Sequence, residues 1–343
     1  MKKIISINIS PDKQVPIITG VAAEAIAEYL PNQQQVLAIV DNNVELWFRK
    51  YFPEIPYILL HADESKKTLQ TIENLTIELL NKGADRQTFL LGVGGGFVTD
   101  ITGFLAATYM RGISFGFIPT TLLAQVDASI GGKNGVNVDA YKNMLGTFTQ
   151  PEFIICNTEV LSTLPPRVFN AGMAEIIKAA LIADSTLFDF IEKHAEKLSQ
   201  RDKNILDELI HRAINIKVEI VERDEKEQGE RRKLNLGHTV GHAIERATKD
   251  IMHGEAVSIG LAYAAKFSQK QGWLNSADVS RICELLQQFH LPIDCLIPAA
   301  ELQKILLKDK KKTGIILHYI ALLSIGKAAE VAIDISDINM FKV

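Results

Sequence analysis

The chain has 343 residues, of which 47% are hydrophobic and 23% are charged, and its formal net charge is −4. This balance suits a globular protein and excludes a general nucleic-acid binder, so any anion site must be a local cluster of bases. The three cysteines lack a Cys-x-x-Cys spacing, which argues against a disulfide framework and a thiolate metal site. No run approaches the roughly 20 apolar residues of a membrane span, and the N-terminal apolar run ends too early for a signal peptide. We therefore expect a cytoplasmic protein.

The first half of the chain alternates short apolar runs with amphipathic stretches. Strands are predicted at residues 36–40, 57–60, 89–93, 115–118 and 153–156, and helices at residues 68–82, ended by Gly83, and 98–110. Strands separated by helices predict parallel βαβ units with right-handed crossovers. The expected fold class is α/β, with a Rossmann-like parallel-sheet domain over residues 1–165.

After Pro165-Pro166 the helical pattern dominates. Helices are predicted at about residues 168–183, 186–199, 204–222, 234–248, 253–271 and 276–290. Strand-like runs return only at residues 315–333, where Gly326 could turn a small hairpin. We expect a second, mainly α-helical domain over residues 166–343.

A glycine-rich turn, Gly94-Gly95-Gly96, joins the predicted strand 89–93 to the next helix. Glycines let a backbone approach a ligand closely, and free N–H groups at a helix start attract phosphate. Phe97 stands where the Gly-x-Gly-x-x-Gly pattern has its last glycine, so a simple tight turn is an equal alternative. Asp41, at the end of an earlier strand, could accept hydrogen bonds from a ribose or could form an Asx-turn.

Residues 119–137 contain a second diglycine, Gly131-Gly132, and Asp127 is their only acid. Around this stretch the chain supplies side chains that can hold a phosphate through charge-assisted hydrogen bonds: Arg111, Lys133, Lys142 and Asn143. A solvated loop would explain one of the lysines but not the shortage of acids.

His238 and His242 stand four residues apart in a predicted helix and so share one face, and His253 follows. Imidazole is the commonest zinc ligand, and a catalytic zinc usually takes three protein ligands. The histidines therefore suggest a metal site, but a pair at this spacing is equally compatible with polar surface or with a hydrogen-bonded pair in the core. Glu175 and Lys178 also share a helix face, and their spacing alone favours an ordinary surface pair.

Taken together, these motifs resemble the 3-dehydroquinate synthase family of the sugar-phosphate cyclases, in one order over about residues 40–326. The matching stretches are Gly94-Gly95-Gly96 with Asp100, Thr102-Gly103-Phe104, Tyr109-Met110-Arg111-Gly112, residues 119–127, Gly131-Gly132-Lys133, Lys142-Asn143, Thr163-Leu164-Pro165, residues 174–178, 234–239, 241–245, 253–257 and 309–311.

The resemblance implies a role for each matching residue. It implies a zinc or cobalt site at Glu175, His238 and His253, which makes His242 a substrate contact rather than a ligand. NAD contacts are implied at Asp41, Asn43, Glu64, Lys67, Gly95, Gly96, Phe97, Asp100, Thr120, Thr121, Lys133, Lys142, Leu161 and Thr163. Catalytic and substrate contacts are implied at Arg111, Asp127, Lys133, Asn143, Lys178, Lys217, Glu227, Arg231, Asn235, His242 and Lys310.

The implied reaction converts 3-deoxy-D-arabino-heptulosonate 7-phosphate to 3-dehydroquinate and phosphate, in the shikimate pathway to the aromatic amino acids. It comprises transient oxidation at C5, loss of phosphate, re-reduction, ring opening and an intramolecular aldol closure. The resemblance also implies a homodimer in which Arg111 reaches the neighbouring site, while Arg231 and Lys217 hold the carboxylate.

Three other classes remain open. Another sugar-phosphate cyclase would take a substrate without a carboxylate, and Arg231 argues against that. A metal-dependent polyol dehydrogenase would not need a phosphate cluster, and a non-enzymatic ligand sensor would not need to keep three metal ligands. The sequence departs from the family pattern at Asn134 and Glu230, and Lys311 competes with Lys310 for one substrate contact.

Overall fold

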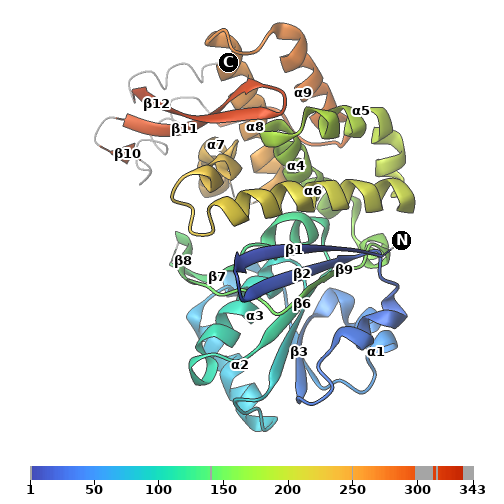
Figure 1. Cartoon of the computed structure of the whole chain (residues 1–343). Helices are drawn as coiled ribbons and strands as arrows, with labels where there is room; N and C mark the ends of the chain where they lie inside the picture. The colour runs from blue at the N-terminus through green and yellow to red at the C-terminus, as the bar shows by residue number, and fades with distance from the viewer. Residues whose placement is uncertain (1, 140, 249, 298–311, 314–315, 335–343) are drawn as a thin grey trace. The chain divides into compact units, whose positions relative to one another are not determined.

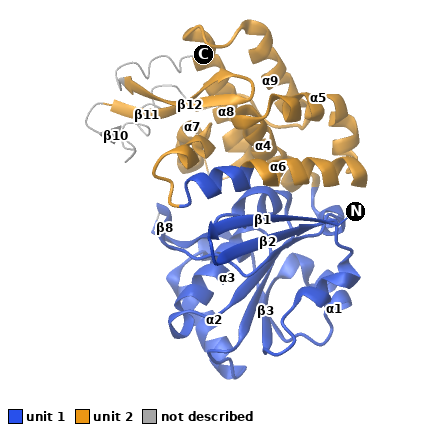
Figure 2. Ribbon diagram, viewed as in Figure 1, with its two compact units in different colours: residues 1–165, 217–225 blue, residues 166–216, 226–343 orange. Residues whose placement is uncertain are grey.

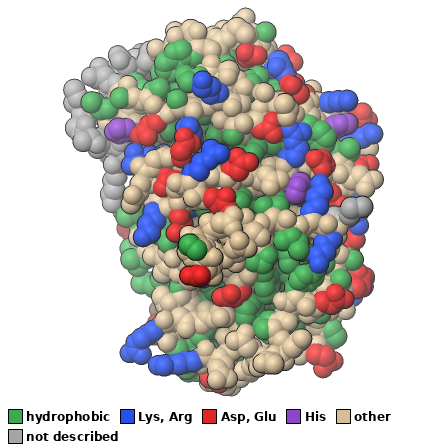
Figure 3. All heavy atoms as spheres, in the orientation of Figure 1, with side chains coloured by type: hydrophobic (Ala, Val, Ile, Leu, Met, Phe, Trp, Pro, Cys, Tyr) green, Lys and Arg blue, Asp and Glu red, His purple; other side chains and the backbone are tan. Residues whose placement is uncertain are grey.

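The computed structural model describes residues 2–139, 141–248, 250–297, 312–313 and 316–334 (Figure 1). The chain forms two compact units, which Figure 2 distinguishes by colour. Unit 1 contains residues 1–165 and 217–225, and unit 2 contains residues 166–216 and 226–343. On the face shown in Figure 3, acidic and basic side chains are interspersed.

Unit 1 is built on a seven-stranded sheet with the order β1-β2-β9-β6-β5-β3-β4. Its strands are β1 (Lys3–Ser10), β2 (Lys13–Thr19), β3 (Val36–Asp41), β4 (Tyr57–Leu60), β5 (Phe89–Gly94), β6 (Phe115–Pro119) and β9 (Ile154–Cys156). All neighbours pair in parallel except β1, which is antiparallel to β2. Strands β5 and β6 are buried along their whole length, as expected where helices cover both faces of a parallel sheet.

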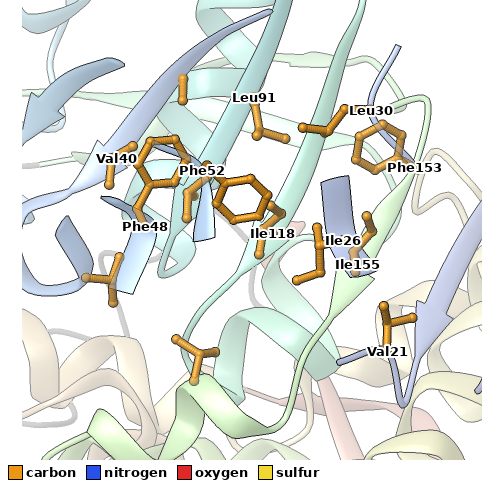
Figure 4. Close-up of a cluster of buried hydrophobic side chains, with 14 of the residues drawn as sticks. Val21, Ile26, Leu30, Val40, Phe48, Phe52, Leu91, Ile118, Phe153 and Ile155 are labelled. Carbon is orange, nitrogen blue, oxygen red and sulfur yellow. The ribbon is translucent and has the colours of Figure 1, made fainter. Parts of the chain in front are cut away.

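The helices of unit 1 are α1 (Glu45–Tyr51), α2 (Leu69–Asn81) and α3 (Gly96–Thr108), with short turns η1 (Ala23–Tyr29), η2 (Asn42–Val44), η3 (Glu64–Lys66), η4 (Tyr109–Arg111), η5 (Ala124–Ala128) and η6 (Glu159–Thr163). The Thr68 hydroxyl caps α2 by accepting from the Thr71 N–H at 3.4 Å, and Gly83 follows its end at φ +72°. Figure 4 shows part of the core, where Phe48, Phe52 and Ile118 pack among aliphatic side chains of the strands.

Two hairpins of unit 1 were absent from the predicted elements. One is β1–β2; the other pairs β7 (Lys133–Val138) with β8 (Tyr141–Phe148). Gly135 and Gly146 face each other across the second hairpin, and a Cβ at either would lie 2.6 Å from a backbone oxygen of the opposite strand. The glycines that resemble a loop in the sequence therefore let two strands approach.

Unit 2 is mainly helical, with α4 (Pro166–Ala183), α5 (Ser185–Ser199), α7 (His238–Ala247), α8 (His253–Lys270), α9 (Ser276–Gln288) and the turn η7 (Glu230–Asn235). A sheet of β10 (Lys312–Thr313), β11 (Ile316–Ser324) and β12 (Lys327–Asp334) completes it, and Gly326 turns β11 into β12 at φ +84°, as predicted. None of the helices in the described ranges is both long and apolar enough to cross a membrane.

Helix α8 packs against α4 and α7 with almost no space between the backbones. A Cβ at Gly254 would lie 1.9 Å from the Ala171 carbonyl oxygen of α4, and a Cβ at Gly260 would lie 1.9 Å from the Gly237 oxygen just before α7. Only glycine permits these approaches, so the sequence fixes how the three helices meet.

Helix α6 (Lys203–Arg223) begins in unit 2, but its last residues belong to unit 1, although the sequence placed residues 217–225 in the helical domain. Glu222 accepts hydrogen bonds from the Asn8 backbone N–H at 2.7 Å and from its side-chain amide at 2.6 Å. The Gln150 amide donates to Glu225 at 2.9 Å, and Lys217 forms an ion pair with Asp127. Polar contacts from three parts of unit 1 therefore hold this segment.

Candidate active site

The carboxyl ends of β3 and β5 mark the point where the strand order of unit 1 reverses. From β3 the chain moves outward to β4, then returns to β5 on the other side of β3 and continues through β6 to β9. In open parallel sheets, ligands bind beside the carboxyl ends of the strands at such a switch point. Asp41 and the Gly94-Gly95-Gly96 turn lie at this point.

The structure shows Asp41 in the Asx-turn that the sequence allowed. Its Oδ1 accepts hydrogen bonds from the Asn43 backbone N–H at 3.0 Å and the Asn43 amide at 2.9 Å. Asp41 and Asn43 are thus brought together, as a pair of contacts on one ligand requires. The Asx-turn and a role in ribose binding do not exclude each other, because a carboxylate has a second oxygen.

The glycine turn is set by packing. A Cβ at Gly94 would lie 2.6 Å from Cβ of Val98 and 3.0 Å from Cβ of Asp41, so only glycine fits between them. Gly95 precedes α3 and its oxygen accepts the Thr99 N–H at 3.0 Å, which starts the helix. The N-terminus of α3 therefore lies at the switch point, where the N–H groups of its first turn can bind an anion.

Lys67 joins two residues for which the sequence implied different ligands. Its buried ammonium donates to Asp100 at 2.5 Å and to Asn143 at 2.6 Å. Burial raises the pKa of the Asp100 carboxyl to about 6, although the Lys67 charge opposes that shift. The Asn137 side chain extends the network by accepting from the Asn143 N–H at 2.8 Å and donating to Glu64 at 2.8 Å. Sequence reasoning had given Asn137 no role.

Asp127 lies in η5, a short π-helix, a geometry that is frequent at functional sites. Its ion pair with Lys217 brings together two of the predicted substrate contacts. The remaining predicted residues of unit 1 are dispersed around the same strand ends. Phe97, Thr120, Thr121, Leu161 and Thr163 lie on α3, after β6 and in η6, whereas Lys133 and Lys142 are exposed on the β7–β8 hairpin.

Arg111 lies in a turn where two successive non-glycine residues have positive φ. Met110 and Arg111 have φ values of +48° and +71°, followed by Gly112 at +120°. Non-glycine residues rarely adopt positive φ, and such strain gathers at functional positions. Arg111 is exposed on unit 1.

Unit 2 brings Glu175, His238 and His253 together: each offers a ligand atom, and these atoms lie within 4.8 Å of one another. Oε1 of Glu175 is 3.8 Å from Nε2 of His238 and 3.4 Å from Nε2 of His253. Ligand atoms of a tetrahedral zinc with bonds of about 2.1 Å are about 3.4 Å apart, so the residues fit a bound divalent metal. Figure 1 shows α4, α7 and α8, which carry them.

The other imidazole nitrogens already have partners. Nδ1 of His238 lies 3.1 Å from the Leu236 carbonyl oxygen, and Nδ1 of His253 lies 3.3 Å from Glu245. With Nδ1–H donated to these acceptors, both Nε2 lone pairs are directed toward the same point. Glu245 had no predicted role, although its spacing of seven residues from His238 places both on one helix face.

The pKa shifts of the two histidines differ in direction. Burial and the nearby Lys178 charge lower the pKa of His238 well below its usual value, which keeps the imidazole neutral. Burial also lowers the pKa of His253, but hydrogen bonds to Glu175 and Glu245 outweigh it and raise the pKa to about 9. A cation bound among the three residues would take the place of that proton.

Glu175 and Lys178 are both buried and form an ion pair, so the surface pair favoured by their spacing is wrong. The reason is that α4 turns this face toward α7 and α8, which spacing alone does not reveal. The His242 ring lies 5.2 Å from that of His238 and 6.1 Å from that of His253, at the edge of the cluster.

The turn η7 and the residues just before it carry three more of the predicted substrate contacts of unit 2. Arg231 is 2% exposed, and the Asn235 amide donates to the Glu227 carboxylate at 2.5 Å. Glu227 itself has a positive φ of +59°. Lys310, with Asp309 and Lys311, lies outside the described residues.

The solved structures that are similar to this chain at 26–27% identity are cyclases. The 2-epi-5-epi-valiolone synthase from Streptomyces hygroscopicus subsp. jinggangensis, solved with NAD+ and Zn2+, has a TM-score of 0.88 and 26% identity over 97% of both chains. A 2-deoxy-scyllo-inosose synthase complexed with carbaglucose-6-phosphate, NAD+ and Co2+ has a TM-score of 0.83 and 27% identity, covering 98% of this chain and 99% of that one. The fold is that of the sugar-phosphate cyclases.

Sequence comparison narrows the class to one family. The family model for 3-dehydroquinate synthase N-terminal matches residues 57–171, and that for 3-dehydroquinate synthase C-terminal matches residues 172–312. A 3-dehydroquinate synthase of Halorhodospira halophila is 45% identical over 278 residues, which are 80% of this chain and 78% of that protein. The chain belongs to the 3-dehydroquinate synthase family, as the sequence motifs predicted.

Proposed function

We propose that this enzyme converts 3-deoxy-D-arabino-heptulosonate 7-phosphate to 3-dehydroquinate and phosphate, with NAD and a divalent metal, zinc or cobalt. The observation that carries the proposal is the Glu175–His238–His253 cluster, with both Nε2 atoms directed at one buried carboxylate, in a chain of this family. The shikimate pathway and a cytoplasmic location, which the cysteine pattern suits, belong to the same proposal.

NAD would accept a hydride from C5 of the substrate and later return it, so the cofactor is regenerated within each turnover. Unit 1 supplies groups suited to hold it: the α3 N-terminus for the pyrophosphate, and Asp41 with Asn43 for a ribose. The Lys67–Asp100 ion pair stiffens the region beside α3 and links it to Asn143 of β8.

A metal held by Glu175, His238 and His253 would bind the substrate hydroxyls and lower the pKa of the one that is oxidised. Lys178, paired with Glu175, limits the negative charge at the carboxylate and keeps it oriented. The neutral state of His238 leaves its lone pair available to the metal.

The substrate's two anionic ends need separate partners. Arg231 is buried and its guanidinium matches a carboxylate bidentately, so we assign it to the carboxylate together with Lys217. Lys133, Asn143 and His242 are assigned to the phosphate, through charge-assisted hydrogen bonds. The leaving phosphate can itself accept the proton from C6. Asn235 and Glu227, which are hydrogen-bonded to each other, would orient the sugar hydroxyls.

A homodimer is part of the proposal. The β7–β8 hairpin exposes Tyr141, Met144 and Phe148, each about half exposed, and Met110 beside Arg111 is also exposed. Apolar side chains gathered on an element are typical of a protein interface, and a second copy of this chain would cover them. Arg111 would then reach the neighbouring subunit's site.

The test is release of inorganic phosphate from the heptulosonate phosphate, with catalytic amounts of NAD and zinc. Glucose 6-phosphate and sedoheptulose 7-phosphate, which lack the carboxylate, are the controls. Release from the first substrate alone, without net NADH, is the expected result. Release from a control sugar would assign another cyclase activity, and steady NADH from a polyol would assign a dehydrogenase.

A further inference from the structure

A second carboxylate, Glu245, lies against the metal cluster without belonging to the three assigned ligands. Its side chain is 6% exposed, and its Oε1 is 3.3 Å from Nδ1 of His253. Among the described residues there are therefore two groups with metal-ligand spacing, Glu175–His238–His253 and His242–Glu245–His253, which share His253.

Because both groups include His253, this imidazole can bind a metal in only one of them at a time. Nε2 of His253 faces Glu175 and Nδ1 faces Glu245. A neutral imidazole has one lone pair and one N–H, so His253 can bind a metal on one side only while it donates a hydrogen bond on the other.

His238 indicates which side binds the metal. Its Nδ1 is directed at the Leu236 carbonyl oxygen, an acceptor that requires Nδ1–H, so its lone pair on Nε2 faces Glu175. The two histidines thus share one arrangement: Nδ1–H donated to a protein oxygen and Nε2 directed to the same point. We propose that Glu245 is a positioning residue, which accepts the Nδ1–H of His253 and fixes its tautomer and ring orientation for the metal. This inference rests on the proposed metal site.

The fold holds Glu245 in place through backbone contacts. His238, His242 and Glu245 follow the helical spacing of α7 and share one face. A Cβ at Gly241 would lie 3.1 Å from the Ala256 carbonyl oxygen, so α7 approaches α8 closely at the turn that carries His253. The start of α8 is fixed in turn by a two-point ion pair of Arg167 with Glu255, at 2.6 and 2.7 Å. With both helices held, the carboxylate need not be ordered when the metal binds.

The test is the zinc affinity of the purified full-length chain after removal of metal, measured by competition with a chromophoric chelator. Acceptors that orient a metal-bound histidine typically contribute 10- to 100-fold in affinity. Glu245→Ala is expected to weaken zinc binding by about this factor, and Glu245→Gln, whose amide oxygen can still accept Nδ1–H, should recover most of the loss. The matched control is Arg246→Ala, an exposed neighbour on α7, which should bind zinc like the wild type.

Cobalt distinguishes a positioning residue from a ligand. In the Co2+-loaded protein, Glu245→Ala should keep the visible d–d spectrum of the wild type, whereas His253→Ala should change it. Wild-type zinc affinity in Glu245→Ala, equal loss in Glu245→Gln and Glu245→Ala, or an altered cobalt spectrum in Glu245→Ala would each overturn the inference. Failure of the wild type to bind zinc would instead refute the proposed metal site, and NAD affinity checks that each variant is folded.

Discussion

Replacing Gly254 with alanine should separate two of the assigned metal ligands without altering either. The new Cβ would lie 1.9 Å from the Ala171 oxygen, against about 3.4 Å for an ordinary contact, so α8 must retreat from α4 by about 1.5 Å. Helix α8 carries His253 at its first residue, and α4 carries Glu175. The two ligand atoms, now 3.4 Å apart, would no longer both reach one metal ion.

Two effects should follow from this displacement. Overpacking of this kind typically lowers the free energy of unfolding by about 1–3 kcal/mol, and misplacement by about 1 Å can cost about 100-fold in turnover. We expect Gly254→Ala to unfold at a lower urea concentration than the wild type. We also expect it to bind zinc at least tenfold more weakly. Gly272→Ala, at φ +76° with nothing within 4 Å of the added Cβ, is the control that should lose stability but keep its affinity for zinc. If Gly254→Ala binds zinc as tightly as the control, the close approach does not position His253.

Three further predictions test other parts of the site. Arg231→Ala should lower kcat/KM at least about 100-fold, because it removes a buried charge from the substrate carboxylate, while NAD affinity stays near wild type; a large loss of NAD affinity would contradict the assignment. Burial raises the pKa of Asp100 from 3.8 to about 6, so the folded protein binds this proton more tightly than the unfolded chain does. The resulting contribution to the free energy of unfolding is complete below pH 3.8 and is lost as the pH rises through about 6, by about 3 kcal/mol in total. The stability of Asp100→Asn relative to the wild type should therefore increase as the pH rises from 4 to 7 in urea unfolding, whatever the loss of the Lys67 ion pair costs at every pH, and the same pH slope in both proteins would refute the shift. Mixing Arg111→Ala with Arg231→Ala subunits should restore about a quarter of wild-type activity if subunits pair at random, because half of the dimers then contain one intact site; no recovery would refute a contribution of Arg111 across the dimer.

The sequence predicted elements well where local chemistry alone sets them. Helix α2 lies within the predicted range 68–82 and ends before Gly83, and β3, β4 and β5 agree with their apolar runs to within one residue. The predicted helix at residues 234–248 begins only at His238, because Gly237 adopts φ +77° and separates it from η7. Local sequence patterns locate most elements, but they do not reveal which glycine adopts a positive φ and so interrupts a helix.

Features set by distant parts of the chain could not be predicted in this way. The pattern of residues 131–137 resembles a loop, because a hairpin built on paired glycines lacks the alternating apolar signal of a strand. Glu175 and Lys178 share a face, but their burial depends on α7 and α8. The amphipathic repeat of α6 likewise does not reveal that residues 217–225 belong with unit 1. The site roles came from motif resemblance, and the structure adds partners such as Glu245 and Asn137 that motifs do not single out.

The course of α6 has a consequence for dissecting this protein. A recombinant fragment of residues 1–165 would contain the first of the two segments of unit 1. It would lack the second segment, residues 217–225, which contacts Asn8, Asp127 and Gln150. Such a fragment would expose the surface that this segment covers and leave Asp127 without its Lys217 partner. A fusion that appends residues 217–225 through a flexible linker would restore the partners of Asn8, Asp127 and Gln150. The compact units of this chain are therefore defined by contacts between segments, and one cut in the sequence does not separate them.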